Sequence, residues 1–247
     1  MPNSNSRTPS NPSTPLKASS GSGGKTLSVV LLSGGLDSSA NLAFAAERDT
    51  VVLALHVDYG QRAAAPEWRA SRALAEYYGV KIERIEIPWL GALGGSSLTD
   101  KSRDVPELKA SELDTLPKIQ ETAKAVWVPN RNGVLLNIAA AYAERFRAKR
   151  IVVGFNREEA TTFPDNSRPF LDQTTRAFAY STRNGVEAYC YTTAMDKTEI
   201  VGALKALARP FPHALVWSCY HAGSAPCGRC ESCGRHDRAL KAGGIEA

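Results

Sequence analysis

From Leu27 onward, short apolar runs alternate with segments of helical periodicity, and this alternation restricts the fold more than any other feature of the sequence. Five runs predict strands, at residues 27–32, 51–57, 81–87, 151–155 and 186–192, and the run at 81–87 alternates apolar and charged residues as a half-buried strand does. Helical patterns cover residues 38–48, 66–78, 132–147, 169–183 and 196–208. Because strands that alternate with helices pair in parallel, we predict a doubly wound α/β domain with a five-stranded parallel sheet.

The segments outside this alternation suggest the domain organisation. Residues 1–26 are rich in Ser, Pro, Gly and Asn, which predicts a disordered tail, with a transit peptide as the alternative. Residues 89–124 lack a clear period and contain Gly and Pro, so we expect a lid or a substrate loop there. We therefore predict a tail (1–26), an α/β domain (27–215) and a small C-terminal lobe (216–247).

Charge and hydropathy exclude several classes of partner. The formal net charge is +5, but three of the basic residues lie in the acid-free first 26 residues. The remaining charge is too small to predict a nucleic-acid partner. No run approaches the roughly 18 apolar residues of a membrane helix. Four of the five cysteines cluster near the C-terminus, which is unlike a distributed disulfide framework and favours a reducing, cytoplasmic location.

A glycine-containing turn, Ser33–Ser38, follows the first predicted strand. Gly34 and Gly35 permit positive φ and a close approach of backbone N–H groups to an anion. The helix that follows adds its N-terminal amides, so the turn is typical of a phosphate site. Asp37 is suited to hold Mg²⁺ beside the phosphates. The alternative is a purely structural turn in which Asp37 or Ser38 caps the helix.

The clustered cysteines, Cys219, Cys227, Cys230 and Cys233, are separated by seven, two and two residues. Four thiolates suit tetrahedral Zn²⁺, and a site with four protein ligands is structural because it leaves no open position. Such an ion would stabilise a lobe too small to have its own core. An iron–sulfur cluster and a pair of disulfides are the alternatives.

The string Ser33-Gly34-Gly35-Leu36-Asp37-Ser38 resembles the signature of the PP-loop ATP pyrophosphatases, which cleave ATP between its α- and β-phosphates. Together with the cysteines, the chain resembles one PP-loop family, the 7-cyano-7-deazaguanine synthases of queuosine-precursor biosynthesis. The motifs of that family occur here in order, as Asp58-Tyr59-Gly60-Gln61-Arg62, Ser96-Ser97-Leu98-Thr99, Val128-Pro129-Asn130-Arg131-Asn132, Trp217-Ser218-Cys219-Tyr220 and Cys227-Gly228-x-Cys230-x-x-Cys233. The chain departs from the family at residues 158–166, where only the Pro-Asp pair is kept.

The resemblance implies an ATP-dependent ligase that converts 7-carboxy-7-deazaguanine and ammonia into the nitrile, with ATP–Mg²⁺ and a structural Zn²⁺ as cofactors. Its partners would be these small molecules, without nucleic acid or membrane, and the enzyme would be a homodimer. The expected catalytic residues are Ser33, Asp37, Ser38, Arg131 and Lys197. The expected ATP-binding residues are Leu32, Ser33, Gly34, Gly35, Leu36, Asp37, Ser38, Ser39, Asp58, Gly60 and Gln61. The expected substrate-binding residues are Arg62, Asn132, Asn156 and Asp165.

Other interpretations of these residues remain open. Lys197 is equally a solvated surface residue, Arg62 a member of a surface ion pair, and Asn132 the N-cap of the helix that begins there. A related PP-loop enzyme that joins a deazapurine acid to another amine is the main alternative function. Transfer-RNA thiolases, which share the PP-loop, and a zinc-knuckle nucleic-acid binder are two further possibilities.

Overall fold

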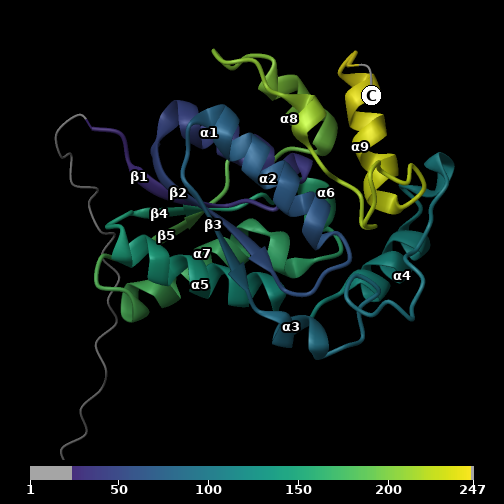
Figure 1. Cartoon of the computed structure of the whole chain (residues 1–247), viewed down its shortest axis with the longest axis horizontal. Helices are drawn as coiled ribbons and strands as arrows, with labels where there is room; N and C mark the ends of the chain where they lie inside the picture. The colour runs from purple at the N-terminus through teal and green to yellow at the C-terminus, as the bar shows by residue number, and fades with distance from the viewer. Residues whose placement is uncertain (1–23, 246–247) are drawn as a thin grey trace, which may run out of the picture.

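The computed structural model describes residues 24–245. Most of the predicted tail therefore lies outside the described residues, and the description begins three residues before the first strand. Five strands form one parallel sheet in the order β3-β2-β1-β4-β5 (Figure 1). They are β1 (Leu27–Leu31), β2 (Thr50–Asp58), β3 (Ile82–Glu86), β4 (Arg150–Val152) and β5 (Glu187–Tyr189). This arrangement confirms the predicted doubly wound parallel sheet.

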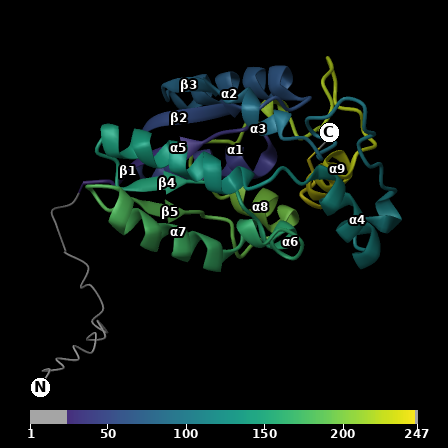
Figure 2. The ribbon, with the colours of Figure 1, turned by 90° about the horizontal axis from the view of Figure 1, so that it is seen from below.

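Helices cover both faces of this sheet, as Figure 2 shows. Helices α5 (Arg131–Arg145) and α7 (Arg168–Ser181) lie on one face, where Val29 and Leu53 pack with Leu136 and Phe178. Helices α1 (Leu36–Arg48) and α2 (Ala64–Tyr78) lie on the other face. Adjacent residues of a strand point to opposite faces, so β1 contributes to two apolar clusters. A strand whose central residues are buried on both faces is typical of a parallel sheet.

The irregular segment and the cysteine lobe contain helices that the sequence patterns did not predict. The expected loop at residues 89–124 contains α3 (Pro88–Ala92), the short 3₁₀ turn η1 (Ala110–Glu112) and α4 (Leu116–Val126). The loop after β4 contains α6 (Arg157–Ala160) and η2 (Pro164–Asn166), and residues 213–215 form η3 (His213–Leu215). Helix α9 (Glu231–Ala242) begins within the cysteine motif and packs beside α8 (Lys197–Leu204).

Several predicted boundaries are wrong by a few residues. Helix α1 begins at Leu36 with Gly35 as its N-cap, so neither Asp37 nor Ser38 is the cap. The N-cap of α5 is Asn130, which places Asn132 inside the first turn. Strands β4 and β5 end at Val152 and Tyr189, before the predicted residues 155 and 192. No helix in the described part of the chain is both long and apolar enough to span a bilayer.

Candidate active site

The turn between β1 and α1 lies at the carboxyl edge of the sheet, where ligands bind in open α/β folds. Gly34 has φ +86°, and a Cβ there would lie 2.8 Å from the Cβ of Ala70 and 2.9 Å from the carbonyl oxygen of Glu67. The hydroxyls of Ser33 and Ser38 are 2.9 Å apart. Only glycine therefore fits the tightest point of the turn, which lets the backbone approach a phosphate without side-chain interference.

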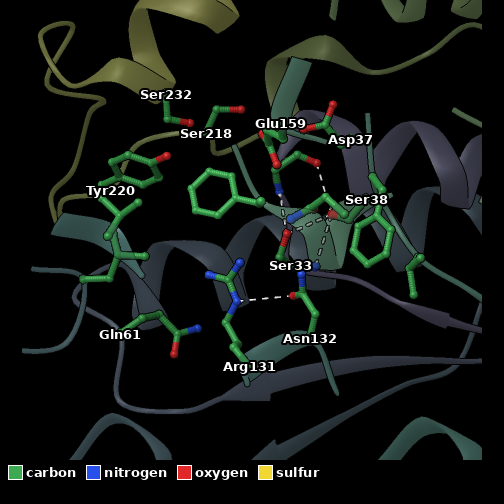
Figure 3. Close-up of a pocket in the computed structure, with 18 of the residues that line it drawn as sticks. Ser33, Asp37, Ser38, Gln61, Arg131, Asn132, Glu159, Ser218, Tyr220 and Ser232 are labelled. Carbon is green, nitrogen blue, oxygen red and sulfur yellow. Dashed lines mark hydrogen bonds between the residues drawn. The ribbon is translucent and has the colours of Figure 1, made fainter. Parts of the chain in front are cut away.

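A cavity of about 260 Å³ opens beside this turn. Its walls come from the turn itself, the segment between β2 and α2, α4 and the residue after it, the start of α5, the loop that follows β4, the start of α8, and the C-terminal segment that carries the cysteines. Figure 3 shows Ser218, Tyr220 and Ser232 of the C-terminal segment across the cavity from Gln61 and Arg131. The cavity therefore brings together residues that are separated by nearly the whole described chain.

Three charged side chains form a cluster on one side of the cavity. The ammonium group of Lys197 forms ion pairs with Asp37 and, at 3.0 Å, with Glu159. Burial raises the pKa of Asp37, and the nearby ammonium of Lys197 opposes that effect. Burial is the largest single influence on Glu159 and raises its pKa, but the charge and hydrogen bond of Lys197, together with Asn156 and Arg131, lower the pKa overall. The side chain of Lys197 is only 8% exposed, so its interpretation as a solvated surface residue is wrong.

The donor set around Asp37 fits a magnesium ion. One carboxylate oxygen accepts from Lys197, while Oδ1 is buried and has no hydrogen-bond partner. Hard cations prefer carboxylate oxygens, and Mg²⁺ uses one or two of them together with phosphate oxygens. An unpartnered buried oxygen next to a phosphate turn is therefore the atom that such an ion requires.

A second polar cluster lies across the cavity, around Arg131 at the start of α5. Its guanidinium lies 5.8 Å from the ring centroid of Tyr59 and donates to the Tyr59 hydroxyl at 3.4 Å. Gln61 donates to Glu67 at 2.8 Å, and burial raises the pKa of Glu67 to about 7. Arg131 thus presents a positive charge to the cavity, opposite the lysine cluster.

The structure brings together most of the residues that the sequence predicted for the site. The cavity is lined by Leu32, Ser33, Gly35, Leu36, Asp37, Ser38, Gln61, Arg131, Asn132, Asp165 and Lys197. Asn132 donates to the carbonyl of Asp165 at 3.3 Å, which ties the loop after β4 to helix α5. The predicted catalytic residues all lie on this one cavity.

The other predicted residues lie behind the cavity wall, where they hold its loops. Asp58 pairs with Arg84 at 2.6 Å and accepts from the N–H of Gly60 at 2.9 Å. Arg62 donates to the carbonyls of Ser97 at 2.7 Å and Asp100 at 2.6 Å. These contacts fix the segments that follow β2 and α3, and they replace the surface ion pair considered for Arg62.

Three further predicted residues also support the site from behind. Gly34 is enclosed by α2, and the hydroxyl of Ser39 donates to the carbonyl of Gly35 at 2.7 Å. Asn156 is fully buried and caps α6, accepting from the N–H of Glu159 at 2.9 Å. Asn156 therefore positions Glu159 and is not among the residues that line the cavity.

Sequence reasoning did not single out Tyr59, Glu67, Trp127, Glu159 or Phe163, all of which line the cavity. Tyr59 could have been predicted, because it lies within the family motif Asp58-Tyr59-Gly60-Gln61-Arg62. Glu159 and Phe163 lie in the segment where the chain departs from the family pattern, so the resemblance offered none for them.

The four clustered cysteine sulfurs lie within 4.8 Å of one another. All four are free thiols, which excludes the pair of disulfides. The backbone N–H groups of His221 and Cys230 point to the sulfurs of Cys219 and Cys227, each at 3.3 Å. Backbone donors of this kind stabilise thiolates, and four converging sulfurs suit a tetrahedral metal ion. The cluster fits a zinc ion, and one of its members, Cys219, also lines the cavity.

The cysteine lobe is also part of the active-site wall. The N–H of Trp217 donates to the carbonyl of Gly34 at 2.8 Å, and the N–H of Leu36 donates to the hydroxyl of Ser218 at 3.3 Å. From α9, Arg235 pairs with Glu158 at 2.7 Å. The lobe therefore holds both the phosphate turn and the loop that carries Glu159.

Comparison with known proteins decides the family. Residues 27–244 match the model of the family described as queuosine biosynthesis protein QueC. The chain belongs to the QueC family. The 7-cyano-7-deazaguanine synthase of Desulforudis audaxviator is 49% identical over 88% of this chain and 98% of its own length. Those of Methanosarcina mazei and Bdellovibrio bacteriovorus are each 48% identical over 88% of this chain and 95% and 94% of their own lengths.

Among solved structures, the NMN synthetase of Francisella tularensis is similar over 91% of this chain and 79% of its own, with a TM-score of 0.45 and 14% identity. The family assignment rests on the sequence relatives. In this QueC-family chain, the six predicted motifs fall within the matched residues 27–244.

Proposed function

We propose that this chain is an ATP-dependent ligase that converts 7-carboxy-7-deazaguanine and ammonia into 7-cyano-7-deazaguanine. The observation that carries the proposal is the single cavity in which the phosphate turn faces Arg131, Asn132 and Asp165. An acid bound on that side would lie against the α-phosphate of a nucleotide bound on the turn.

The chemistry explains why ATP is required. Ammonia does not displace oxide from a carboxylate, so the acid oxygen first attacks the α-phosphorus and releases pyrophosphate. Ammonia then attacks the acyl carbon, AMP leaves with the oxygen that came from the acid, and a proton is lost to give the amide. In a second round the amide oxygen attacks another ATP and releases pyrophosphate. Loss of AMP and of the two N–H protons gives the nitrile.

The residues of the chain act by positioning and by charge stabilisation. The N–H groups of the turn and of the first turn of α1 face the phosphates. Lys197 and Arg131, on opposite sides of the cavity, neutralise charge that moves onto the leaving pyrophosphate and AMP. Asp37 would hold a magnesium ion, which supplies further charge neutralisation when bound.

Asp165 is the residue that suits the base edge of the substrate. A guanine-like edge offers two neighbouring N–H donors, and a carboxylate accepts both with its two oxygens. Asn132 holds the Asp165 backbone in place at the start of α5. The cysteine cluster would bind zinc in a closed structural site, and the five free thiols suit a reducing, cytoplasmic location.

The test is to supply the acid labelled with ¹⁸O in its carboxyl group, together with ammonium and ATP. We expect a nitrile product by mass spectrometry and AMP that carries the label. Unlabelled AMP would contradict adenylation of the acid. A heavier product that joins the acid to another amine would instead support the conjugating alternative. Asp37→Asn should abolish turnover while leaving the metal content of the cysteine cluster unchanged.

A further inference from the structure

Two aromatic rings meet at the edge of the active-site cavity, on segments that are distant in the sequence. Trp127 directly follows α4, and Phe163 directly precedes η2; both line the cavity. Their ring planes are within 3° of parallel and their centroids are 6.0 Å apart. The other ring pairs found in residues 24–245 meet at 45–83°. A parallel pair of this kind is suited to hold a flat molecule.

We propose that Trp127 and Phe163 form an aromatic clamp that binds the flat bicyclic ring of the acid substrate between them. This inference rests on the proposed function and names the residues that recognise the faces of the substrate. A ring inserted between two parallel rings needs about 3.5 Å on each side, so the ring planes must lie about 7 Å apart. Planes whose ring centroids are 6.0 Å apart lie closer together than that, so the segments that carry Trp127 and Phe163 must separate for the substrate ring to enter.

The exposure of Trp127 supports this role. This residue is 38% exposed although it lies beside a cavity, and large apolar residues are usually buried more completely. A bound heteroaromatic ring would cover that face. Stacking on aromatic side chains contributes substantially to base binding and tolerates different bases, because every base has a flat face.

The neighbouring polar group distinguishes the acid from ATP as the occupant. Asp165 follows Phe163 by two residues and lines the same cavity. A guanine-like edge presents two adjacent donors to a carboxylate, whereas adenine presents one donor beside an acceptor, which a carboxylate disfavours. The clamp and Asp165 together therefore match a deazaguanine and mismatch adenine.

The clamp is tested with Trp127→Leu and Phe163→Leu, and with the aromatic replacements Trp127→Phe and Phe163→Tyr. In steady-state assays, the leucine variants should raise KM for the acid by about 10- to 100-fold, with KM for ATP unchanged. The aromatic variants should stay within a few-fold of the original protein. Trp89→Leu is the matched control, because Trp89 lies on α3, is 54% exposed and is not among the residues that line the cavity.

Tryptophan fluorescence gives a second readout, taken without ATP so that no turnover occurs. The acid should quench emission of the original protein and of Trp89→Phe, and should quench Trp127→Phe much less. An unchanged KM for the acid in both leucine variants, with turnover intact, would overturn the clamp and leave the proposed function standing. A rise in KM for ATP would mean that the rings hold adenine and would also overturn it. Absence of turnover in the original protein would instead overturn the proposed function.

Discussion

The buried lysine that joins Asp37 and Glu159 gives the sharpest energetic prediction. In Lys197→Met the side chain keeps a similar length but loses its charge, so two carboxylates remain in the cavity without their cation. Lys197 is 8% exposed, Asp37 14% and Glu159 34%. Removing one partner of a buried ion pair costs about 3–5 kcal/mol. Because solvent partly screens Glu159, we expect Lys197→Met to lower the free energy of unfolding by about 3 kcal/mol at pH 8.

The pH dependence of this loss has a definite sign. Burial raises the pKa of Asp37 above its usual 3.8, and without Lys197 no ammonium charge opposes that effect. A carboxyl group whose pKa is higher in the folded than in the unfolded protein destabilises the fold as pH rises. The destabilisation begins above the unfolded-state pKa and is complete above the folded-state pKa. The loss of stability should therefore be smaller at pH 5 than at pH 8.

The assay is denaturant unfolding at both pH values, with ATP turnover measured in parallel. The matched control is the double variant Lys197→Met/Asp37→Asn, which removes the uncompensated charge at Asp37. It should recover about 1–2 kcal/mol of stability relative to Lys197→Met while remaining inactive. A loss below about 1 kcal/mol at pH 8, or an equal loss at both pH values, would refute the buried-pair reasoning.

Three further predictions concern the turn, the second cluster and the metal lobe. In steady-state assays, Gly34→Ala should reduce turnover at least tenfold, because the new Cβ would clash with the carbonyl of Glu67 and with Ala70. Gly95→Ala is the control and should reduce turnover far less, because Gly95 also has a positive φ but has open space around the position of a Cβ. Burial raises the pKa of Glu67 to about 7, so the charged carboxylate destabilises the fold as pH rises. In denaturant unfolding, the free energy of unfolding of Glu67→Gln should therefore increase relative to that of the original protein between pH 5 and pH 8, by at most about 3 kcal/mol. Cys233→Ser, or chelation of the metal, should lower both the melting temperature and the activity. If both quantities stay unchanged, the cluster does not support the cavity wall.

The sheet and the phosphate turn could be predicted because their signals are local. Buried parallel strands read as continuous apolar runs, and the turn residues follow the first of them directly. The ends of β4 and β5 could not be predicted in this way. After β4 the chain packs closely against the phosphate turn, because a Cβ at Gly154 would lie only 2.3 Å from the N atom of Ser38. This contact depends on the tertiary structure and not on a local pattern in the sequence. The N–H of Tyr191 bonds to the side chain of Asn41 at 2.8 Å, outside the strand ladder.

The missed helices have different causes. Helix α4 has Pro117 at its second position, where proline is compatible with the start of a helix. From the sequence alone, this proline indicates an irregular segment. Helix α9 begins inside the metal motif, where cysteine spacing hides helical periodicity. Trp127 and Phe163 are distant in sequence, and their parallel arrangement depends on how two loops pack.

The two hydrogen bonds between the cysteine lobe and the phosphate turn join segments about 180 residues apart. During synthesis, the turn leaves the ribosome long before the residues that complete its surroundings. We therefore expect the nascent chain to fold its sheet first and to acquire competence for catalysis only in the last stage of maturation, when the thiols have gathered around their ion. Supply of that ion would then set how much newly made protein becomes active, even though a closed site of four cysteines would give the ion no part in the reaction.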